Sequence, residues 1–395
     1  MYKLRDVIAF WILGLCNNYG YVVMLSAAHD ILARNYEPES DITDTTDPSR
    51  RDCNTVSTGA ILLADIVPSL ITKIVAPFFP LAIHVRMAIV VLLGAAGYIL
   101  VAAATASWMA IMGVICTAFA SGLGEASLLS YMAFYKDKNV ISTWSSGTGG
   151  AGVFGAITYA GFTSLGMSPS TTLYTLLIVP LLMAINFWFV LQHPKLNDTA
   201  DSETRSVNHP DNENEVPVAT TQDSFGTKLS YIPNLLPYMI PLGLVYFFEY
   251  FINQGLFELI QYDGIWLTHK EQYRWYQVDY QIGVFISRSS IMLIQINKTW
   301  ILALLQGLNV VLFTLESVYF FLPSVYLILL AVLWEGLLGG AAYVNTYYRI
   351  AAEVPPEKRE FSMAITSLAD SIGITLAGFL SMPIHNYICD LPKSV

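Results

Sequence analysis

Four polar side chains that hydrocarbon cannot solvate stand within one apolar, aromatic stretch, residues 246–259. They are Glu249, Asn253, Gln254 and Glu258. On a regular helix Glu249 and Asn253 share one face because they are four residues apart, and Gln254 and Glu258 repeat that spacing on a neighbouring face. Such groups persist in a membrane helix where they face a protein interior or a wet cavity. The stretch is therefore a candidate substrate-binding site.

A deep cation is predicted in the following span. Arg288, in the sequence FISRSS, lies about 15 residues into its predicted span, too deep for the guanidinium to reach the outer aqueous phase. Its charge needs an anion, which Glu249 or Glu258 could supply. A guanidinium also matches phosphate and carboxylate groups through two parallel hydrogen bonds. We expect a carboxylate to hold Arg288 until an anionic substrate displaces it.

Other ionisable residues within apolar spans are candidates for gating or proton coupling. These are Asp65, Glu125, Glu335 and Asp370. Glu125 follows the glycines of SGLGE, and Glu335 precedes those of EGLLGG. A buried carboxyl can be neutralised by a proton, which makes coupling to proton movement a hypothesis. Lys73 is closer to a predicted span end, where a long side chain reaches toward water.

A glycine-rich motif, WSSGTGGAG, contains Gly147, Gly149, Gly150 and Gly152. It superficially resembles a nucleotide-binding loop, but it lacks the lysine of a P-loop and lies inside an apolar span. Small residues on a membrane helix let another helix approach closely. Helix packing is therefore one interpretation. The alternative is a broken helix whose backbone amides contact a substrate.

The elements that position these residues are predicted to be transmembrane helices. Of the 395 residues, 54% are hydrophobic and only 13% are charged, whereas a soluble domain carries about 25% charged residues. The composition indicates a polytopic membrane protein and excludes a soluble enzyme. There is no basic patch for nucleic acid, and the cysteines lack metal-type spacing. We expect no nucleic-acid partner, no metal and no cofactor.

Eleven apolar segments of about 20 residues, the length that crosses a bilayer, recur along the chain. They lie at residues 7–31, 55–81, 87–105, 108–135, 141–165, 171–192, 232–262, 273–294, 300–322, 323–350 and 361–388. Residues 33–53 form an acidic loop, and the polar residues 193–231 have the composition of a disordered linker. The predicted protein is all-α, with a six-span bundle in residues 1–192 and a five-span bundle in residues 232–395.

Basic residues predict the orientation of these spans. With the N-terminus in the cytoplasm, the cytoplasmic segments hold eleven Lys and Arg residues and the opposite side holds six. The C-terminus then lies on the opposite, lumenal side, where Cys53 and Cys389 could form a disulfide and His29 could titrate in an acidic compartment. Tyr273 and Arg274 have the character of an interfacial anchor. Two bundles joined by a linker are typical of transporters that rock around a central site.

Longer motifs relate the chain to a known family. It resembles the battenin family of lysosomal membrane proteins in the segments SAAHDI, LADI, SGLGE, WSSGTGGAG, EYFINQGLFEL, QYRWYQ, SRSS and EGLLGGAAYVNT. These segments occur in order over nearly the whole chain outside the two polar loops. The resemblance implies a major-facilitator-like fold in late endosomal and lysosomal membranes. It also implies export of glycerophosphodiesters from lumen to cytosol, in support of phospholipid catabolism and lysosomal pH homeostasis.

Motif matches to the family carry over functional positions at Glu249, Arg288 and Asp370. The expected partners are then a small anionic phosphodiester and the lipid bilayer. Two alternatives remain open: transport of basic amino acids by the buried carboxylates, and a non-transporting scaffold that binds trafficking proteins through residues 193–231. A membrane enzyme is not expected, since no HExxH, GxSxG or paired-aspartate motif is present.

Overall fold

The computed structural model describes residues 2–31, 53, 58–76, 81–132, 135, 139–193, 231–291 and 293–392. Every regular element within these residues is a helix, as predicted for an all-α protein. The predicted acidic loop at 33–53 and the linker at 193–231 lie almost entirely outside the described residues.

The helices before residue 193 make up what we call the N-terminal half. They are α1 (Tyr2–Ser26), α3 (Gly59–Val75), α4 (Ile83–Ala102), α5 (Ser107–Met132), α6 (Asn139–Ser164), α7 (Pro169–Thr175), α8 (Ile178–Ile185) and the π-helical η2 (Asn186–Val190). The last three elements follow one another as a single interrupted segment. The predicted sixth span is therefore not one regular helix.

The helices after residue 230 make up the C-terminal half. They are η3 (Ile232–Leu235), α11 (Leu236–Phe251), η4 (Ile252–Leu256), η5 (Phe257–Leu259), α12 (His269–Ser289), α13 (Thr299–Tyr319), α14 (Val325–Glu353) and α15 (Pro356–Cys389). The first four again form one segment, in which α-helix gives way to a π-helical and then a 3-10 turn.

Eight segments of the described residues are long and apolar enough to cross a membrane. Three further long helices, α3, α6 and α12, complete the eleven predicted spans. They are less suited to lipid, since α3 has only 17 residues, α6 is rich in Gly, Ser and Thr, and α12 is largely polar. All three pack at the contact between the halves, α6 on α12 and α3 on α15. Their polar surface is thereby covered by protein.

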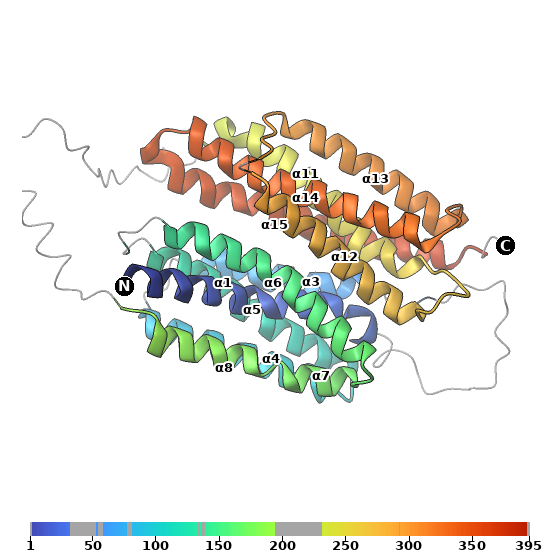
Figure 1. Ribbon diagram of the computed structural model, residues 1–395, viewed down its shortest axis with the longest axis horizontal. Helices are drawn as coiled ribbons and strands as arrows, with labels where there is room; N and C mark the ends of the chain where they lie inside the picture. The colour runs from blue at the N-terminus through green and yellow to red at the C-terminus, as the bar shows by residue number, and fades with distance from the viewer. Residues whose placement is uncertain are drawn as a thin grey trace, which may run out of the picture.

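The two halves lie side by side along the length of the molecule (Figure 1), with blue to green helices in one layer and yellow to red helices in the other. The chain termini lie at opposite ends. At one end, which we call the N-terminal end, the Arg5 guanidinium donates to the Val190 and Phe189 carbonyls. At the other, the disulfide end, Cys53 of the N-terminal half is bonded to Cys389 of the C-terminal half.

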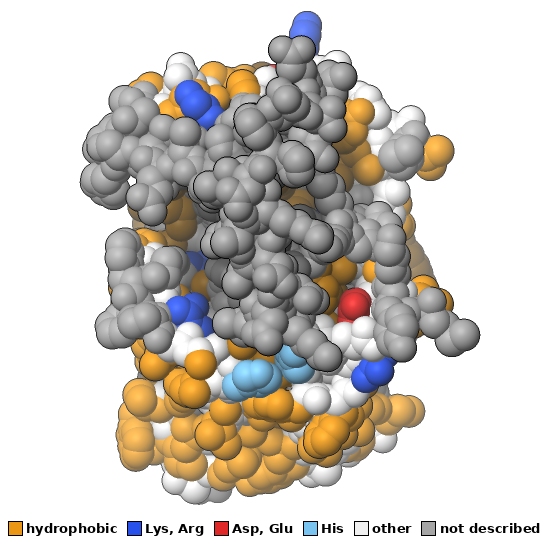
Figure 2. Space-filling model, turned by 90° about the vertical axis from the view of Figure 1, so that its left-hand side faces the viewer, with side chains coloured by type: hydrophobic (Ala, Val, Ile, Leu, Met, Phe, Trp, Pro, Cys, Tyr) orange, Lys and Arg blue, Asp and Glu red, His pale blue; other side chains and the backbone are white. Residues whose placement is uncertain are grey.

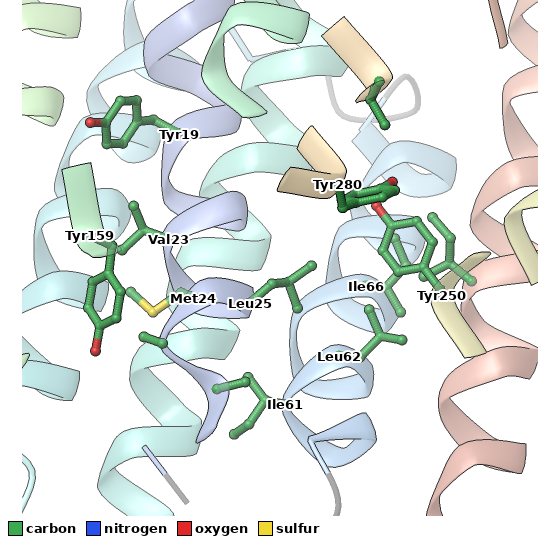
Figure 3. Packing of buried hydrophobic residues seen from close by; sticks show 14 of the residues in the cluster. Tyr19, Val23, Met24, Leu25, Ile61, Leu62, Ile66, Tyr159, Tyr250 and Tyr280 are labelled. Atoms are coloured by element: carbon green, nitrogen blue, oxygen red, sulfur yellow. The ribbon is translucent and has the colours of Figure 1, made fainter. Parts of the chain in front are cut away.

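One hydrophobic core runs through both halves. Figure 3 shows Tyr250 and Tyr280, from α11 and α12, close to Leu62 and Ile66 of α3. These apolar contacts cross the boundary between the halves. The halves therefore form one packed body in this conformation.

Close contact between α1 and α6 depends on a glycine of the WSSGTGGAG motif. A methyl group on Gly147 would overlap the backbone carbonyl oxygen of Trp11. On α1, a methyl group on Gly14 would lie 2.6 Å from the Trp144 carbonyl oxygen. The two backbones approach as closely as small residues allow. Gly147 is therefore a packing position within the N-terminal half.

We predict that Gly147→Ala destabilises the protein, whereas Gly161→Ala on the same helix does not. The first methyl group meets backbone that cannot move aside, and overpacking of this kind costs about 1–3 kcal/mol. The second meets nothing within 4 Å and gains helix propensity of up to about 1 kcal/mol. Thermal unfolding of both variants in detergent checks this. Equal melting temperatures would contradict the close α1 to α6 contact.

Candidate functional site

An ion pair joins the two halves near the disulfide end. The Arg274 guanidinium of α12 donates to both carboxylate oxygens of Asp30, Nε to Oδ2 at 2.9 Å and Nη2 to Oδ1 at 2.6 Å. The Tyr159 hydroxyl of α6 donates to the same carboxylate at 2.8 Å. Both charged side chains are at most one-tenth exposed. The predicted interfacial anchor is therefore wrong, because Arg274 lies inside the protein where Asp30 neutralises it.

Two more contacts close the same end. The Tyr273 hydroxyl, fully buried, lies 3.0 Å from the Leu25 carbonyl oxygen of the other half. The Thr58 hydroxyl donates to the Gln254 carbonyl at 2.5 Å. With the Cys53–Cys389 disulfide, these bonds hold the halves together at this end.

Histidines surround Glu258 at the disulfide end. His385 Nε2 lies 3.3 Å from the Glu258 carboxylate, and both side chains are buried. The His269 ring contacts the Glu258 carbonyl oxygen through Nε2 at 2.6 Å and packs against His29. Burial lowers the pKa of His29 below its usual value, and the charge of Glu258 opposes that shift. His29 is thus a core histidine rather than an exposed pH sensor.

Arg288 lies at the other end of α12, in its last turn. Its Nη2 donates to the Tyr246 hydroxyl at 3.1 Å, and its guanidinium carbon lies 4.3 Å from the centre of the Tyr343 ring. The Nε atom is buried without a partner. Among the described residues no carboxylate forms an ion pair with this guanidinium, so the predicted carboxylate clamp is wrong. The helix ends one residue later, at Ser289, so Arg288 lies far from the His269 end of α12.

Glu249 lies near Arg288 but is held by another group. It accepts a hydrogen bond from the Tyr280 hydroxyl. Its carboxyl occupies the space beside Gly339, where a methyl group would overlap it. The other carboxyl oxygen has no partner, and the charge of Arg288 acts on the group from a distance. Arg288 and Glu249 are therefore neighbours without being an ion pair.

The N-terminal half presents an ion pair to the same region. Lys73 Nζ lies 2.7 Å from Glu125 Oε2, and the two side chains are 21% and 27% exposed. The prediction that Lys73 reaches toward the membrane surface is therefore wrong, because Lys73 forms an ion pair with Glu125. Its charge interacts with Asp370 and Tyr343 of the C-terminal half. Both halves thus contribute charged groups to this region.

We call this set of residues the arginine patch. It comprises Arg288, Tyr246, Tyr343, Glu249, Lys73, Glu125 and Asp370. Its charges come from α3, α5, α11, α12 and α15, so only the folded chain brings them together. Cations and carboxyls with spare hydrogen-bonding capacity face the contact between two halves. Such an arrangement can bind a small polar ion and release it when the halves move.

Comparisons with known proteins decide the family. A family model described as CLN3 protein matches residues 8–391. The chain is 45% identical over 406 residues to battenin of Canis lupus familiaris, covering 98% of this chain and 92% of that protein. It is 35% identical over 432 residues to protein btn-1 of Neurospora crassa, covering 97% and 88%. The chain belongs to the CLN3 protein family.

Solved structures similar to this CLN3-family protein are major-facilitator-type transporters. A bacterial homologue of the human lysosomal transporter Spinster, inward-facing and unoccupied, matches with a TM-score of 0.65 at 13% identity, over 95% of this chain and 81% of that chain. A D-xylose-proton symporter matches with a TM-score of 0.59 at 11% identity, over 100% and 99%. At such identities the likeness shows the fold alone, and the predicted fold class is confirmed.

The π-helical turn η4 separates the polar residues of the EYFINQGLFEL segment. It contains Asn253 and Gln254, so the regular four-residue spacing predicted there does not hold. Asn253 Oδ1 and Gln254 Nε2 are buried without partners, and Gln254 Oε1 lies 3.0 Å from the Tyr273 hydroxyl. Glu258 belongs to the histidine cluster at the disulfide end. This CLN3-family chain therefore places only Glu249 of the four beside Arg288.

Two of the other motif glycines, Gly149 and Gly152, face the opposite half. A methyl group on Gly149 would lie 3.9 Å from Arg288 Cδ, and one on Gly152 would overlap the Gln281 amide. Gly150 lies near the side chains of Leu15 and Trp11. Helix α6 is continuous from Asn139 to Ser164, so the alternative of a broken helix is wrong. Because Gly149 and Gly152 have no side chains, α6 can pack close to α12 beside Arg288.

Two predicted coupling residues stand outside the contacts that define the arginine patch, although the charge of Glu249 acts on Glu335. Glu335 is fully buried on α14 and accepts from the Gln306 amide at 3.3 Å, while its other oxygen has no partner. Asp65 is fully buried on α3, and neither of its oxygens has a partner. The structure therefore does not assemble the predicted coupling residues into one site.

Sequence reasoning missed Tyr246 and Tyr343, the two groups that contact Arg288. Tyr246 stands on the segment already singled out, one turn before Glu249, and Tyr343 follows the EGLLGG glycines by a few residues. Aromatic residues are common throughout this chain. Tyr246 and Tyr343 differ from the other aromatic residues only in their positions around the Arg288 guanidinium. The pairing of Asp30 with Arg274 was likewise invisible, because 244 residues separate the two.

We predict strong energetic coupling between Asp30 and Arg274. In a double-mutant cycle with Asp30→Asn and Arg274→Gln, we expect a coupling energy of about 0.5–3 kcal/mol, because either change alone leaves a buried group unpaired. The pair Arg349 and Glu353 is the matched control. Its side chains are 20% and 44% exposed, and we expect less than about 1 kcal/mol there. Equilibrium unfolding in mixed micelles measures both cycles, and equal coupling would contradict the burial argument.

Proposed function

We propose that this protein is a lysosomal transporter that exports glycerophosphodiesters from lumen to cytosol by alternating access. The observation that carries the proposal is Arg288, a half-buried guanidinium that no carboxylate neutralises among the described residues. Tyr246 and Tyr343 hold it in place without cancelling its charge. A guanidinium with free donors, set between two halves, binds phosphate oxygens through two parallel hydrogen bonds.

The rest of the arginine patch suits a small phosphodiester with hydroxyl groups. Tyr246 and Tyr343 present an aromatic wall with polar ends beside Arg288, and a methyl group on Gly149 would lie 3.9 Å from Arg288 Cδ. Asn253 and Gln254 carry buried amide atoms without partners. They lie toward the disulfide end of the same half, where Gln254 contacts Tyr273, and not beside a phosphate bound at Arg288.

The direction of transport follows from the proposed orientation, with the N-terminal end in the cytosol. Figure 2 looks onto that end, where Lys, Arg and His side chains reach the surface, as expected for a cytoplasmic face. The disulfide lies at the opposite end, in keeping with an oxidising lumen. The bonds at that end close the lumenal side. With its lumenal side closed, this conformation would release cargo to the cytosol once the N-terminal end opens.

We predict that Arg288→Ala abolishes glycerophosphodiester flux in proteoliposomes, because the phosphate loses the guanidinium that we propose binds it. Arg349→Ala is the matched control. Arg349 also lies over a tyrosine, Tyr238 at 4.9 Å, but it is paired with Glu353, so its loss should leave flux nearly unchanged. Tyr246→Phe removes one hydroxyl and tests the site without removing a buried charge.

Three outcomes of the flux experiment separate the candidate functions. Loss of flux with Arg288→Ala and retention with Arg349→Ala support the anion site. Flux of basic amino acids that survives Arg288→Glu would replace the phosphodiester with a cationic cargo held by Glu249 and Asp370. No flux of either compound by the wild-type protein would favour the scaffold that acts through residues 193–231.

Proton coupling follows from the charges of the arginine patch. Two cations, Arg288 and Lys73, face three carboxyls, Glu125, Glu249 and Asp370. An arriving anion adds a further negative charge to a region that already has an excess of carboxyls. Protonation of one carboxyl removes that repulsion. We therefore propose that at least one proton accompanies each anion.

We predict that an acidic pH on the cargo side raises the initial flux several-fold over the rate with equal pH on both sides. Glu249→Gln should transport without this dependence, because its side chain cannot release a proton. Glu258→Gln, in the histidine cluster, is the control and should keep the dependence. Equal rates with and without the pH gradient would remove the coupling claim and leave the anion site standing.

A further inference from the structure

Two cysteines, a histidine and a glutamate meet at the disulfide end. Cys53 of the N-terminal half is bonded to Cys389, the last residue of α15. One ring nitrogen of His385 and the two sulfurs lie within 4.8 Å of one another. His385 Nε2 also lies 3.3 Å from the carboxylate of Glu258, and both of these side chains are at most 1% exposed. Because 336 residues separate the cysteines, no spacing motif reveals this group.

The distances match those between the ligands of a tetrahedral zinc ion. His385 Nε2 lies 3.7 Å from Cys389 Sγ and 3.3 Å from Glu258 Oε1. Zinc binds nitrogen and oxygen at about 2.0–2.2 Å and sulfur at about 2.3 Å, so a tetrahedral site separates nitrogen from sulfur by about 3.6 Å and nitrogen from oxygen by about 3.3 Å. Three potential ligand atoms therefore already stand at the spacings of a zinc site.

A positive charge is needed between His385 and Glu258. His385 Nδ1 lies 3.1 Å from Asn386 Oδ1, an oxygen that can only accept, so Nδ1 carries a hydrogen. Nε2 of a neutral ring would then direct its lone pair at the Glu258 carboxylate, and two electron-pair donors repel each other. A proton between them removes this repulsion while the disulfide is intact, and a metal ion can replace that proton. The Thr58 amide donates to the other Glu258 oxygen at 3.4 Å, which orients the carboxylate as groups behind a metal ligand do.

The disulfide controls whether the two sulfurs can bind a metal, because only the thiolate is a strong ligand. Reduction by a small thiol breaks the sulfur–sulfur bond. Two molecules of that thiol are oxidised to their own disulfide, and each cysteine sulfur gains one electron and one proton. Zinc that binds afterwards displaces both thiol protons and the proton between the histidine and the glutamate.

We propose that Cys53, Cys389, His385 and Glu258 form a zinc site once the disulfide is reduced. Two thiolates, an imidazole and a carboxylate are ligands that zinc accepts in a tetrahedral arrangement. Thiolates favour zinc over magnesium or calcium, which bind oxygen ligands. The two sulfurs must move apart to about 3.8 Å in such a site. Cys53 precedes α3 and does not belong to it, so this sulfur can move without distorting the helix.

The zinc site links the same two halves as the disulfide. Cys53 comes from the N-terminal half and the other three ligands come from the C-terminal half. Reduction without zinc leaves only noncovalent bonds to hold this end together, such as those of Arg274 and Tyr273. The closure of the disulfide end therefore responds both to a thiol reductant and to zinc.

Zinc retention tests the site in the full-length protein, independently of any transported cargo. One purified sample is reduced with a phosphine, which leaves no competing thiol, and a second sample is kept oxidised. Both are incubated with zinc chloride and freed of unbound metal by gel filtration under nitrogen. We expect about one zinc ion per chain in the reduced sample and none in the oxidised sample. Zinc should also raise the melting temperature of the reduced sample by about 2 °C or more.

Cobalt and variants identify the ligands. Cobalt(II) bound tetrahedrally by thiolates absorbs visible light, and we expect these bands in the reduced wild-type protein. His385→Gln, which keeps both cysteines, should weaken zinc binding by about tenfold or more, and Cys53→Ser should abolish it. The double variant Cys16→Ser and Cys116→Ser is the matched control, since these two cysteines lie outside the disulfide, and it should bind zinc as the wild type does.

Other results overturn the proposal. Reduced wild-type protein that retains no zinc, or zinc binding that is undiminished in His385→Gln and Cys53→Ser, shows that these residues form no zinc site. Equal retention by the oxidised protein shows that the thiolates are not ligands. The comparison of reduced with oxidised wild-type protein needs no substitution, so it decides the question even where a variant fails to fold. None of these results affects the anion site at Arg288, because no transported cargo is present.

Discussion

The cost of exposing polar groups to hydrocarbon is the constraint on which this structure depends. Helices α3, α6 and α12 are too short, too rich in small polar residues or too hydrophilic to face lipid alone. Each is covered by packing against the other half or against its own. The contact between the halves is thus made by the helices whose polar surface most needs to be shielded from lipid. The same helices carry Lys73, Gly149 and Arg288, so the region that must be hidden from lipid is also the region able to bind a polar cargo.

The contact between the halves is asymmetric, and that asymmetry gives it a direction. At the disulfide end the charges are paired, with Arg274 on Asp30 and His385 beside Glu258. Toward the N-terminal end, Lys73 is paired with Glu125 but Arg288 has no ion-pair partner among the described residues. A paired contact resists separation, whereas a guanidinium without an anion attracts counter-ions. This arrangement suits a protein that alternates between two openings, with one end sealed at a time.

Buried carboxyls in this chain are compensated in different ways, and the differences separate their roles. Glu125 has a lysine, Glu249 a tyrosine hydroxyl, and Glu335 a glutamine amide. Asp65 has none of these. A carboxyl that is held by a cation or by a neutral hydrogen-bond donor can keep that partner while the halves move.

The sequence by itself determined the all-helical membrane fold and the family, because length, apolar composition and long motifs are local properties of the chain. It also singled out Arg288, Glu249 and Gly147, since a charge or a glycine within an apolar run is visible without a fold. Only the tertiary structure decided which groups meet. Pairing of Asp30 with Arg274, the tyrosines around Arg288 and the isolation of Asp65 depend on contacts between distant segments. The π-helical turn at Asn253 shifted the faces that a regular helix would present, because local spacing predicts a face only while the helix keeps its period.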